Sequence, residues 1–177
     1  VLDKEGEVKA TNRTDILGFN YSSRDYFINV KNNPSKDKLY INAPYKTLLG
    51  ALTINLAVML SDEKGDFNGM VLAVFEPLEL MKTLESVFYS SDMRTSIIHG
   101  NGTLFLIAPQ KDEVLGKRIN AEDSFLYKHK LGNKLNSIYR GISYIANDER
   151  LVAFYTVKPN NIDIDLPLYI TVSRDLN

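Results

Sequence analysis

Hydrophobic and polar residues alternate along much of the chain, as expected for strands that bury one face. The clearest alternation is Leu52-Thr53-Ile54-Asn55-Leu56, and the most apolar segment, residues 70–75, has the length of one strand. The same pattern, together with flanking turn residues, predicts strands around residues 1–10 and at 38–44, 51–60, 69–75, 95–98, 104–108, 139–145, 151–158 and 168–174.

Turn residues separate several of these strands in a recurring way. An apolar strand is followed by Asp or Asn, and at three of the four places by glycine, before the next strand begins; the turns are at Gly6, Gly65, Gly102 and Asn147. Asn, Asp and Gly tolerate the positive φ that tight hairpins require. The pattern therefore predicts hairpins and antiparallel sheets.

Three helices are predicted. Ser22 is a candidate N-cap for a helix that begins near Arg24 and ends before Asn32. A second helix begins at Pro77 and carries apolar residues at i, i+3 and i+4 spacing as far as Phe88. A third, short helix fits residues 124–128.

The order of elements repeats: hairpin, helix and strands in the first half, then hairpin, short helix and strands in the second. Gly6 and Gly102 occupy matching turns. Self-similarity of this kind predicts two copies of one module, at residues 1–92 and 93–177. The predicted fold class is α+β, with a central antiparallel sheet flanked by helices in each module.

Composition narrows the function. With 177 residues, 44% of them hydrophobic and 24% charged, the chain has the composition of a globular protein. The net charge of −1 lacks the basic field of a nucleic-acid-binding protein, so no nucleic acid is expected as a partner. The absence of cysteine excludes thiol catalysis and disulfides, and it suits a periplasmic address. No apolar run is long enough for a membrane helix, and the chain opens in mid-strand, so we interpret it as a piece cut from a longer protein.

No catalytic or metal-binding motif stands out. The two histidines, His99 and His129, lack motif spacing and are predicted at the surface, and the basic residues around His129 are predicted to form a solvated face. We expect no enzyme activity in this chain, no cofactor and no metal. A secreted hydrolase remains an alternative only if a hydroxyl lies beside one of the histidines.

One group of residues favours a small-ligand pocket. A guanidinium binds a carboxylate through paired hydrogen bonds, and aromatic rings form pocket walls. The candidate ligand-binding residues are Arg24, Tyr26, Phe27, Tyr40, Asn42, Tyr45, Lys46 and Asn55. The alternative is that Tyr26 and Phe27 are the apolar face of a helix and that Arg24 and Asp25 form an ion pair.

At these residues the sequence resembles the double-Cache (PDC, PAS-like) extracellular sensor domains of bacterial transmembrane receptors. The first half matches in Arg24-Asp25-Tyr26-Phe27, in Asn42-Ala43-Pro44-Tyr45 and in the turn formed by Asp62, Gly65, Phe67 and Gly69. The second half matches at residues 100–103, 116–119, 139–141 and 149–154. The form of the first motif is most similar to versions joined to GGDEF diguanylate cyclase or histidine kinase output domains.

The resemblance implies the periplasmic or extracellular portion of an inner-membrane protein, anchored by segments outside this chain. It implies a membrane-distal ligand-binding module at residues 1–92, a membrane-proximal module at 93–177, and dimerisation in the full-length receptor. The chain itself would be non-enzymatic, and the output would be cytoplasmic.

A departure from the family pattern bears on the ligand. Amino-acid-binding versions carry two carboxylates that hold the ligand's ammonium, and Thr47 and Val74 stand at those positions here, while Tyr26 replaces a tryptophan. We therefore expect a small carboxylate or another small polar molecule, not a free α-amino acid. The alternative is a periplasmic protein-interaction module with no small-molecule ligand.

Overall fold

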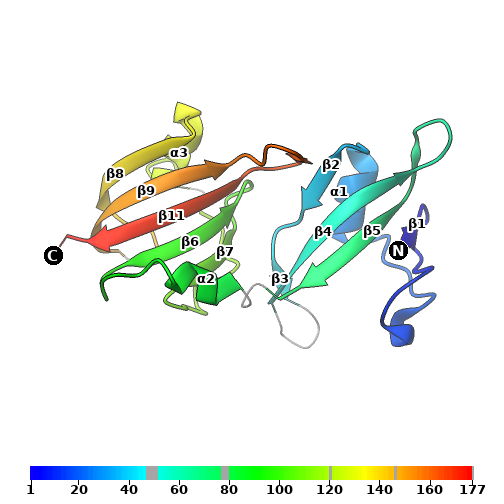
Figure 1. The fold of residues 1–177 in the computed structure, drawn as a ribbon, viewed down its shortest axis with the longest axis horizontal. Helices are drawn as coiled ribbons and strands as arrows, with labels where there is room; N and C mark the ends of the chain where they lie inside the picture. Colours follow the sequence, from blue (N-terminus) through cyan, green and yellow to red (C-terminus); the bar gives the residue numbers. More distant parts are fainter. Residues whose placement is uncertain (47–51, 77–79, 120, 146, 177) are drawn as a thin grey trace. The chain divides into compact units, whose positions relative to one another are not determined.

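The computed structural model describes residues 1–46, 52–76, 80–119, 121–145 and 147–176 (Figure 1). Its contacts divide the chain into two compact units, each with its own sheet. The first unit is Val1–Asn42, Thr53–Phe75 and Pro159–Asp165, and the second is Ala43–Leu52, Glu76–Lys158 and Leu166–Asn177. Among the described residues, no helix is both long and apolar enough to span a membrane.

The first sheet has six strands in the order β1-β5-β4-β2-β10, with β3 paired to β4. The pairings of β1 with β5, of β5 with β4 and of β4 with β2 are antiparallel, whereas β10 pairs with β2 in parallel. The strands are β1 (Leu2–Asp3), β2 (Lys38–Ile41), β3 (Tyr45–Lys46), β4 (Leu52–Ser61), β5 (Phe67–Phe75) and β10 (Asp163–Ile164).

Alternation along β4 shows which face of this sheet is covered. Asn55, Ala57 and Met59 are buried on one face, whereas Val58 and Leu60 on the other face are exposed. Helix α1 (Asp25–Asn32) supplies the cover of the buried face with its own buried residues, Tyr26, Phe27 and Val30.

Two contacts fix the direction of α1. The Tyr40 hydroxyl donates to the carbonyl of Asn33 at the end of the helix. One turn earlier, Asp165 accepts hydrogen bonds from Asn29 Nδ2 (3.1 Å) and from the Ile41 backbone amide (2.9 Å). The helix therefore runs antiparallel to β2.

The second sheet has five strands in the order β7-β6-β11-β9-β8, all antiparallel. Its strands are β6 (Arg94–His99), β7 (Leu104–Ala108), β8 (Asn136–Ile142), β9 (Glu149–Val157) and β11 (Leu168–Asp175). Helix α2 (Met81–Glu85) packs on β6 and β7 through Met81 and Leu84, and α3 (Phe125–Gly132) buries Leu126 in the core cluster that contains Ile98 and Phe154.

The predicted hairpin turns are present. Gly6 (φ 86°), Gly65 (φ 90°), Gly102 (φ 95°) and Asn147 (φ 55°) all adopt the positive φ that these turns require. The mixed α+β class with antiparallel sheets is confirmed as well.

Several predicted details are wrong. Ser22 does not cap α1: its N-cap is Arg24, without a side-chain hydrogen bond. Ser22 instead donates its backbone amide to Asn20 Oδ1 (2.9 Å). Helix α2 is much shorter than the predicted 77–88, although residues 77–79 lie outside the described residues. The two-residue strands β3 and β10 and the 3₁₀ turn η1 (Thr14–Ile16) were not predicted.

The two units are not continuous in sequence. Residues 159–165 return to the first sheet, and α2 belongs to the second unit. The module boundary at residue 92 stays a prediction.

Candidate functional site

The aromatic residues predicted to line a pocket lie in the core of the first unit. Tyr26, Phe27 and Tyr40 are only 8%, 1% and 1% exposed. The Phe27 ring meets the ring of Phe67 edge to face, with centroids 5.7 Å apart. Burial raises the pKa of the Tyr40 hydroxyl. These rings therefore pack against other side chains under α1.

Asn42 and Asn55 are brought together at the end of β2. Asn55 is fully buried in β4, and its carbonyl accepts the Asn42 backbone amide at 3.0 Å. The side-chain nitrogen of Asn42, Nδ2, is buried and has no acceptor among the residues that the structure describes. A buried donor without a partner costs about 1–3 kcal/mol, so this nitrogen marks a place where an acceptor would bind favourably.

The remaining predicted residues lie nearer the surface or outside the described part of the chain. Arg24 is exposed at the start of α1, and the alternative ion pair with Asp25 is absent between these two described residues. Tyr45 is half-buried in β3. Lys46 has its backbone in β3, but its side chain and Thr47 lie outside the described residues.

The second unit contains a cavity of about 540 Å³, a volume that includes its open mouth. It lies between the inner face of the second sheet and the start of α3. Arg94 and Arg150 line one end of it, Ser96 and Thr171 contribute hydroxyls, and Phe154 is part of an apolar wall. The sequence prediction missed this cavity, because its lining comes from segments that are far apart in the chain.

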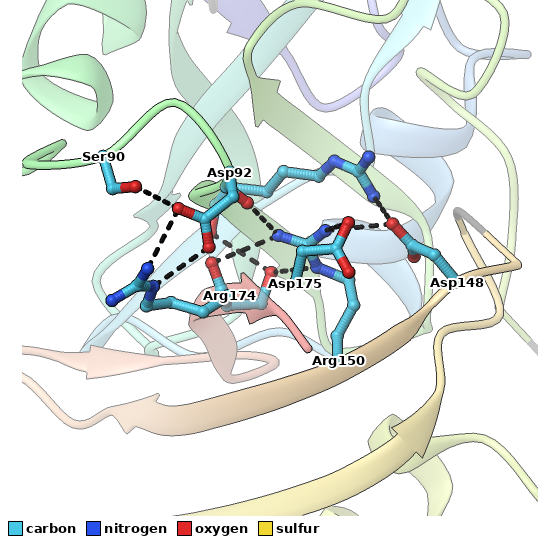
Figure 2. A network of polar contacts seen from close by, with 8 residues as sticks. Ser90, Asp92, Asp148, Arg150, Arg174 and Asp175 are labelled. Atoms are coloured by element: carbon cyan, nitrogen blue, oxygen red, sulfur yellow. Dashed lines mark hydrogen bonds and ion pairs between the residues drawn. The ribbon is translucent and has the colours of Figure 1, made fainter. Parts of the chain in front are cut away.

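A polar network surrounds the arginines at this end (Figure 2). Arg150 donates to Asp148 Oδ2 (3.0 Å), to Ser173 Oγ (3.0 Å) and to the carbonyl of Asp92. Arg94 donates to the same oxygen of Asp148 at 2.9 Å. Burial alone would raise the pKa of Asp148, but Arg150 and Arg94 outweigh it and leave that pKa lowered. The fully buried Arg150 is therefore held in one position by charge-assisted hydrogen bonds.

Both histidines are buried, which corrects the surface prediction: His99 is 3% and His129 1% exposed. His129 lies on the inward side of α3, stacked on Phe154 with ring centroids 5.1 Å apart. Its Nδ1 is 2.5 Å from Ser137 Oγ and its Nε2 is 2.8 Å from Thr156 Oγ1. The basic residues around it, Lys128, Lys130, Lys134 and Arg140, are exposed as predicted, so only the histidine departs from the predicted solvated face.

The hydroxyls beside His129 do not support a hydrolase. A catalytic histidine activates an accessible nucleophile with one nitrogen and is oriented through the other. Here hydroxyls take up both ring nitrogens, and the ring is sealed from solvent. In the described part of the chain, no group of three or more His, Asp or Glu residues could hold a metal ion.

No protein-family model matches the sequence, and no curated protein matches it. Solved structures do match in fold. The extracellular domain of rpHK1S-Z16, a protein named as a histidine kinase, is 20% identical with a TM-score of 0.79, over 98% of this chain and 68% of that one.

Two chemoreceptor domains are also similar. The periplasmic sensory domain of Tlp1 from Campylobacter jejuni is 16% identical with a TM-score of 0.68, over 88% of this chain but only 56% of that one. The ligand-binding domain of PctB from Pseudomonas aeruginosa PAO1, solved with L-Arg, is 16% identical with a TM-score of 0.67, over 98% of this chain and 69% of that one. This chain therefore has the fold of extracellular and periplasmic sensor domains of histidine kinases and chemoreceptors.

Proposed function

We propose that this chain is the periplasmic or extracellular sensor region of an inner-membrane receptor, a region that is itself non-enzymatic. It binds a small ligand in the first unit and signals to a cytoplasmic output such as a diguanylate cyclase or a histidine kinase. The fold likeness to receptor sensor domains supports this role. Membrane anchors and dimerisation would come from the full-length receptor.

The strand order supports two tandem PAS-like modules. We place them at residues 1–92 and 93–177, with residues 159–165 returning to the first sheet. In the first sheet β1 pairs with β5, β5 with β4 and β4 with β2. In the second sheet β6 pairs with β11, β11 with β9 and β9 with β8. In each proposed module the first strand is thus paired with the last, and the pairing then runs back through the preceding strands. A duplicated module explains this shared order.

The single observation that carries ligand binding in the first unit is the unpartnered Asn42 Nδ2. Because α1 runs antiparallel to β2, Arg24 at the start of the helix and Asn42 just beyond β2 lie toward the same end. An anionic ligand at this end could accept hydrogen bonds from both side chains.

Val74, at a position that is acidic in amino-acid-binding versions, favours a carboxylate or another small polar molecule over a free α-amino acid as the ligand. Val74 lies directly opposite Asn55 in the pairing of β4 with β5 and is 55% exposed. Directly opposite residues share one face of the sheet. At the position where amino-acid-binding versions carry an acid, the chain therefore presents an apolar side chain that cannot pair with an ammonium group.

A thermal-shift screen tests the proposal by comparing small carboxylates with their matched α-amino acids, for example propanoate with alanine. A ligand at a hundred times its dissociation constant should stabilise the fold by about 2.7 kcal/mol. Arg24→Ala and Asn42→Leu should each abolish the shift, whereas Arg13→Ala, an exposed arginine of the same unit, should not. Tight calorimetric binding of alanine or a similar amino acid would sink the ligand assignment.

The second candidate is a periplasmic protein-interaction module without a small-molecule ligand. The close packing of Tyr26, Phe27 and Tyr40 favours it, since these rings leave little exposed surface for a ligand. It predicts that no small molecule in the screen stabilises the first unit, and that the chain forms a saturable complex with a purified periplasmic partner.

A further inference from the structure

Two arginines, Arg94 and Arg150, line one end of the cavity of the second unit. Asp148 pairs with both of them, and no Asp or Glu is among the described residues that line the cavity itself. Arg150 already donates hydrogen bonds to Asp148, Ser173 and Asp92. Arg94 donates a single hydrogen bond, to Asp148, among the described residues, and its side chain is 24% exposed. Since a guanidinium has five N–H groups, Arg94 can still donate to a ligand.

The start of α3 lies at the same end of the cavity. Ser124, the N-cap, and Phe125 both line the cavity. The ring of Phe125 lies over Gly141, where an added Cβ would be 3.5 Å from the ring. Gly141 in β8 is in turn paired with Arg150 in β9. The helix therefore begins at the arginine end. Backbone amides in the first turn of a helix have no acceptor within the helix, and they favour an anion.

The cavity also has an apolar lining. It comes from Ile98, Leu126, Val152 and Phe154, which belong to the main core cluster of this unit. In register with Phe154, the hydroxyls of Ser96 and Thr171 lie 2.6 Å apart on paired strands. One of them donates to the other, which leaves one hydroxyl hydrogen for a further acceptor.

We propose that this cavity is a second ligand site, independent of the proposed site in the first unit, for a small monocarboxylate with an apolar body. The carboxylate binds Arg94 and the first-turn amides of Phe125 and Leu126, since Ser124 already accepts the amide of Tyr127. The apolar body lies against Phe154 and Val152. The guanidinium of Arg94 can pair with one carboxylate, which fits a monocarboxylate.

Phenylacetate is the probe, and phenylacetamide is its neutral match. In the wild-type chain, a ¹H–¹⁵N titration with phenylacetate should shift the amide signals of Ser96, Phe125 and Thr171, and calorimetry should show at least tenfold weaker binding of the amide. Arg94→Ala should weaken phenylacetate binding at least tenfold. Arg140→Ala, which removes an exposed arginine of the same unit, should leave binding unchanged.

The titration of the wild-type chain tests the proposed cavity site even if the Arg94→Ala variant fails to fold. The proposal is overturned if phenylacetate shifts no cavity amide at millimolar concentration, if its shifts fall only in the first unit, or if acid and amide bind equally. Arg24→Ala separates the two sites: it should abolish the first-unit response to propanoate and leave the phenylacetate response intact.

Discussion

Arg174 and Asp92 form a bidentate ion pair, with Nε 3.0 Å from Oδ2 and Nη2 3.1 Å from Oδ1 (Figure 2). The pair joins the end of β11 to the segment that precedes β6. Asp92 also accepts a hydrogen bond from buried Arg150 through its backbone carbonyl. The pairing with Arg174, helped by Ser90, holds the pKa of Asp92 well below its usual range. An exposed and a buried arginine thus converge on one residue.

Burial should make the two arginines differ in their effect on stability. The Arg150 side chain is 2% exposed and that of Arg174 is 46% exposed. Arg150→Ala leaves Asp148 without one of its cations in a buried site and should lower the free energy of unfolding by about 3–5 kcal/mol. Arg174→Ala should lower it much less, because water screens the exposed pair. Urea denaturation of both variants measures the difference, and equal losses would contradict this account.

Ser124 is the N-cap of α3, whereas Ser22, predicted as the N-cap of α1, is not a cap. Ser124 Oγ accepts the backbone amide of Tyr127 at 3.2 Å and caps α3. Ser124→Ala should therefore destabilise the chain by about 1 kcal/mol. Ser22 was predicted to cap α1 but makes no such bond, so Ser22→Ala, as the matched control, should change stability by less than about 0.5 kcal/mol. Loss of stability in the Ser22 variant alone would overturn the cap assignment.

Turns in this chain are set by local residues, whereas short edge strands are set by distant ones. The hairpin turns at Gly65 and Gly102 were predictable, because glycine between two apolar strands decides the turn without help from the rest of the chain. Strand β10 was not, since its two residues, Asp163 and Ile164, are ordered by pairing with β2, which precedes it by more than a hundred residues.

Local sequence signals also predicted part of the candidate site in the first unit, but not the cavity of the second unit. The meeting of Asn42 and Asn55 follows from two strands that the alternation of residues had already indicated. Arg150 follows two acidic residues after a turn and is typical of an exposed position by sequence. It is buried because Asp92 and Ser173, from distant segments, satisfy its guanidinium. The cavity was missed for the same reason.

His129 should make stability depend on pH. Burial lowers the pKa of its imidazole in the folded state, so the unfolded chain binds the proton at higher pH than the folded chain does. Stability is therefore retained above the unfolded pKa of about 6.5 and falls as pH drops from there toward the folded pKa, by up to about 1.4 kcal/mol per pH unit. His129→Gln removes the titrating group, and urea denaturation between pH 7.5 and 5 should show a smaller slope than the wild type. An unchanged slope would assign the effect to other groups.

Asp165 should hold α1 to β2. Its two carboxylate oxygens accept the Ile41 amide at 2.9 Å and Asn29 Nδ2 at 3.1 Å. Asp165→Ala leaves both donors without this acceptor and should lower stability by about 1.5–3 kcal/mol, with faster hydrogen exchange at the Ile41 amide. Asp165→Asn keeps one acceptor oxygen, so its stability should fall between those of the wild type and the alanine variant.

Asp163 provides the matched control, because it is exposed in the same segment and pairs with β2 only through its backbone. Asp163→Ala should change stability by less than about 0.5 kcal/mol and leave exchange at Ile41 at the wild-type rate. If exchange at Ile41 rises equally in the Asp163 and Asp165 variants, the parallel pairing of β10 with β2, and not the carboxylate, holds this edge of the first sheet together.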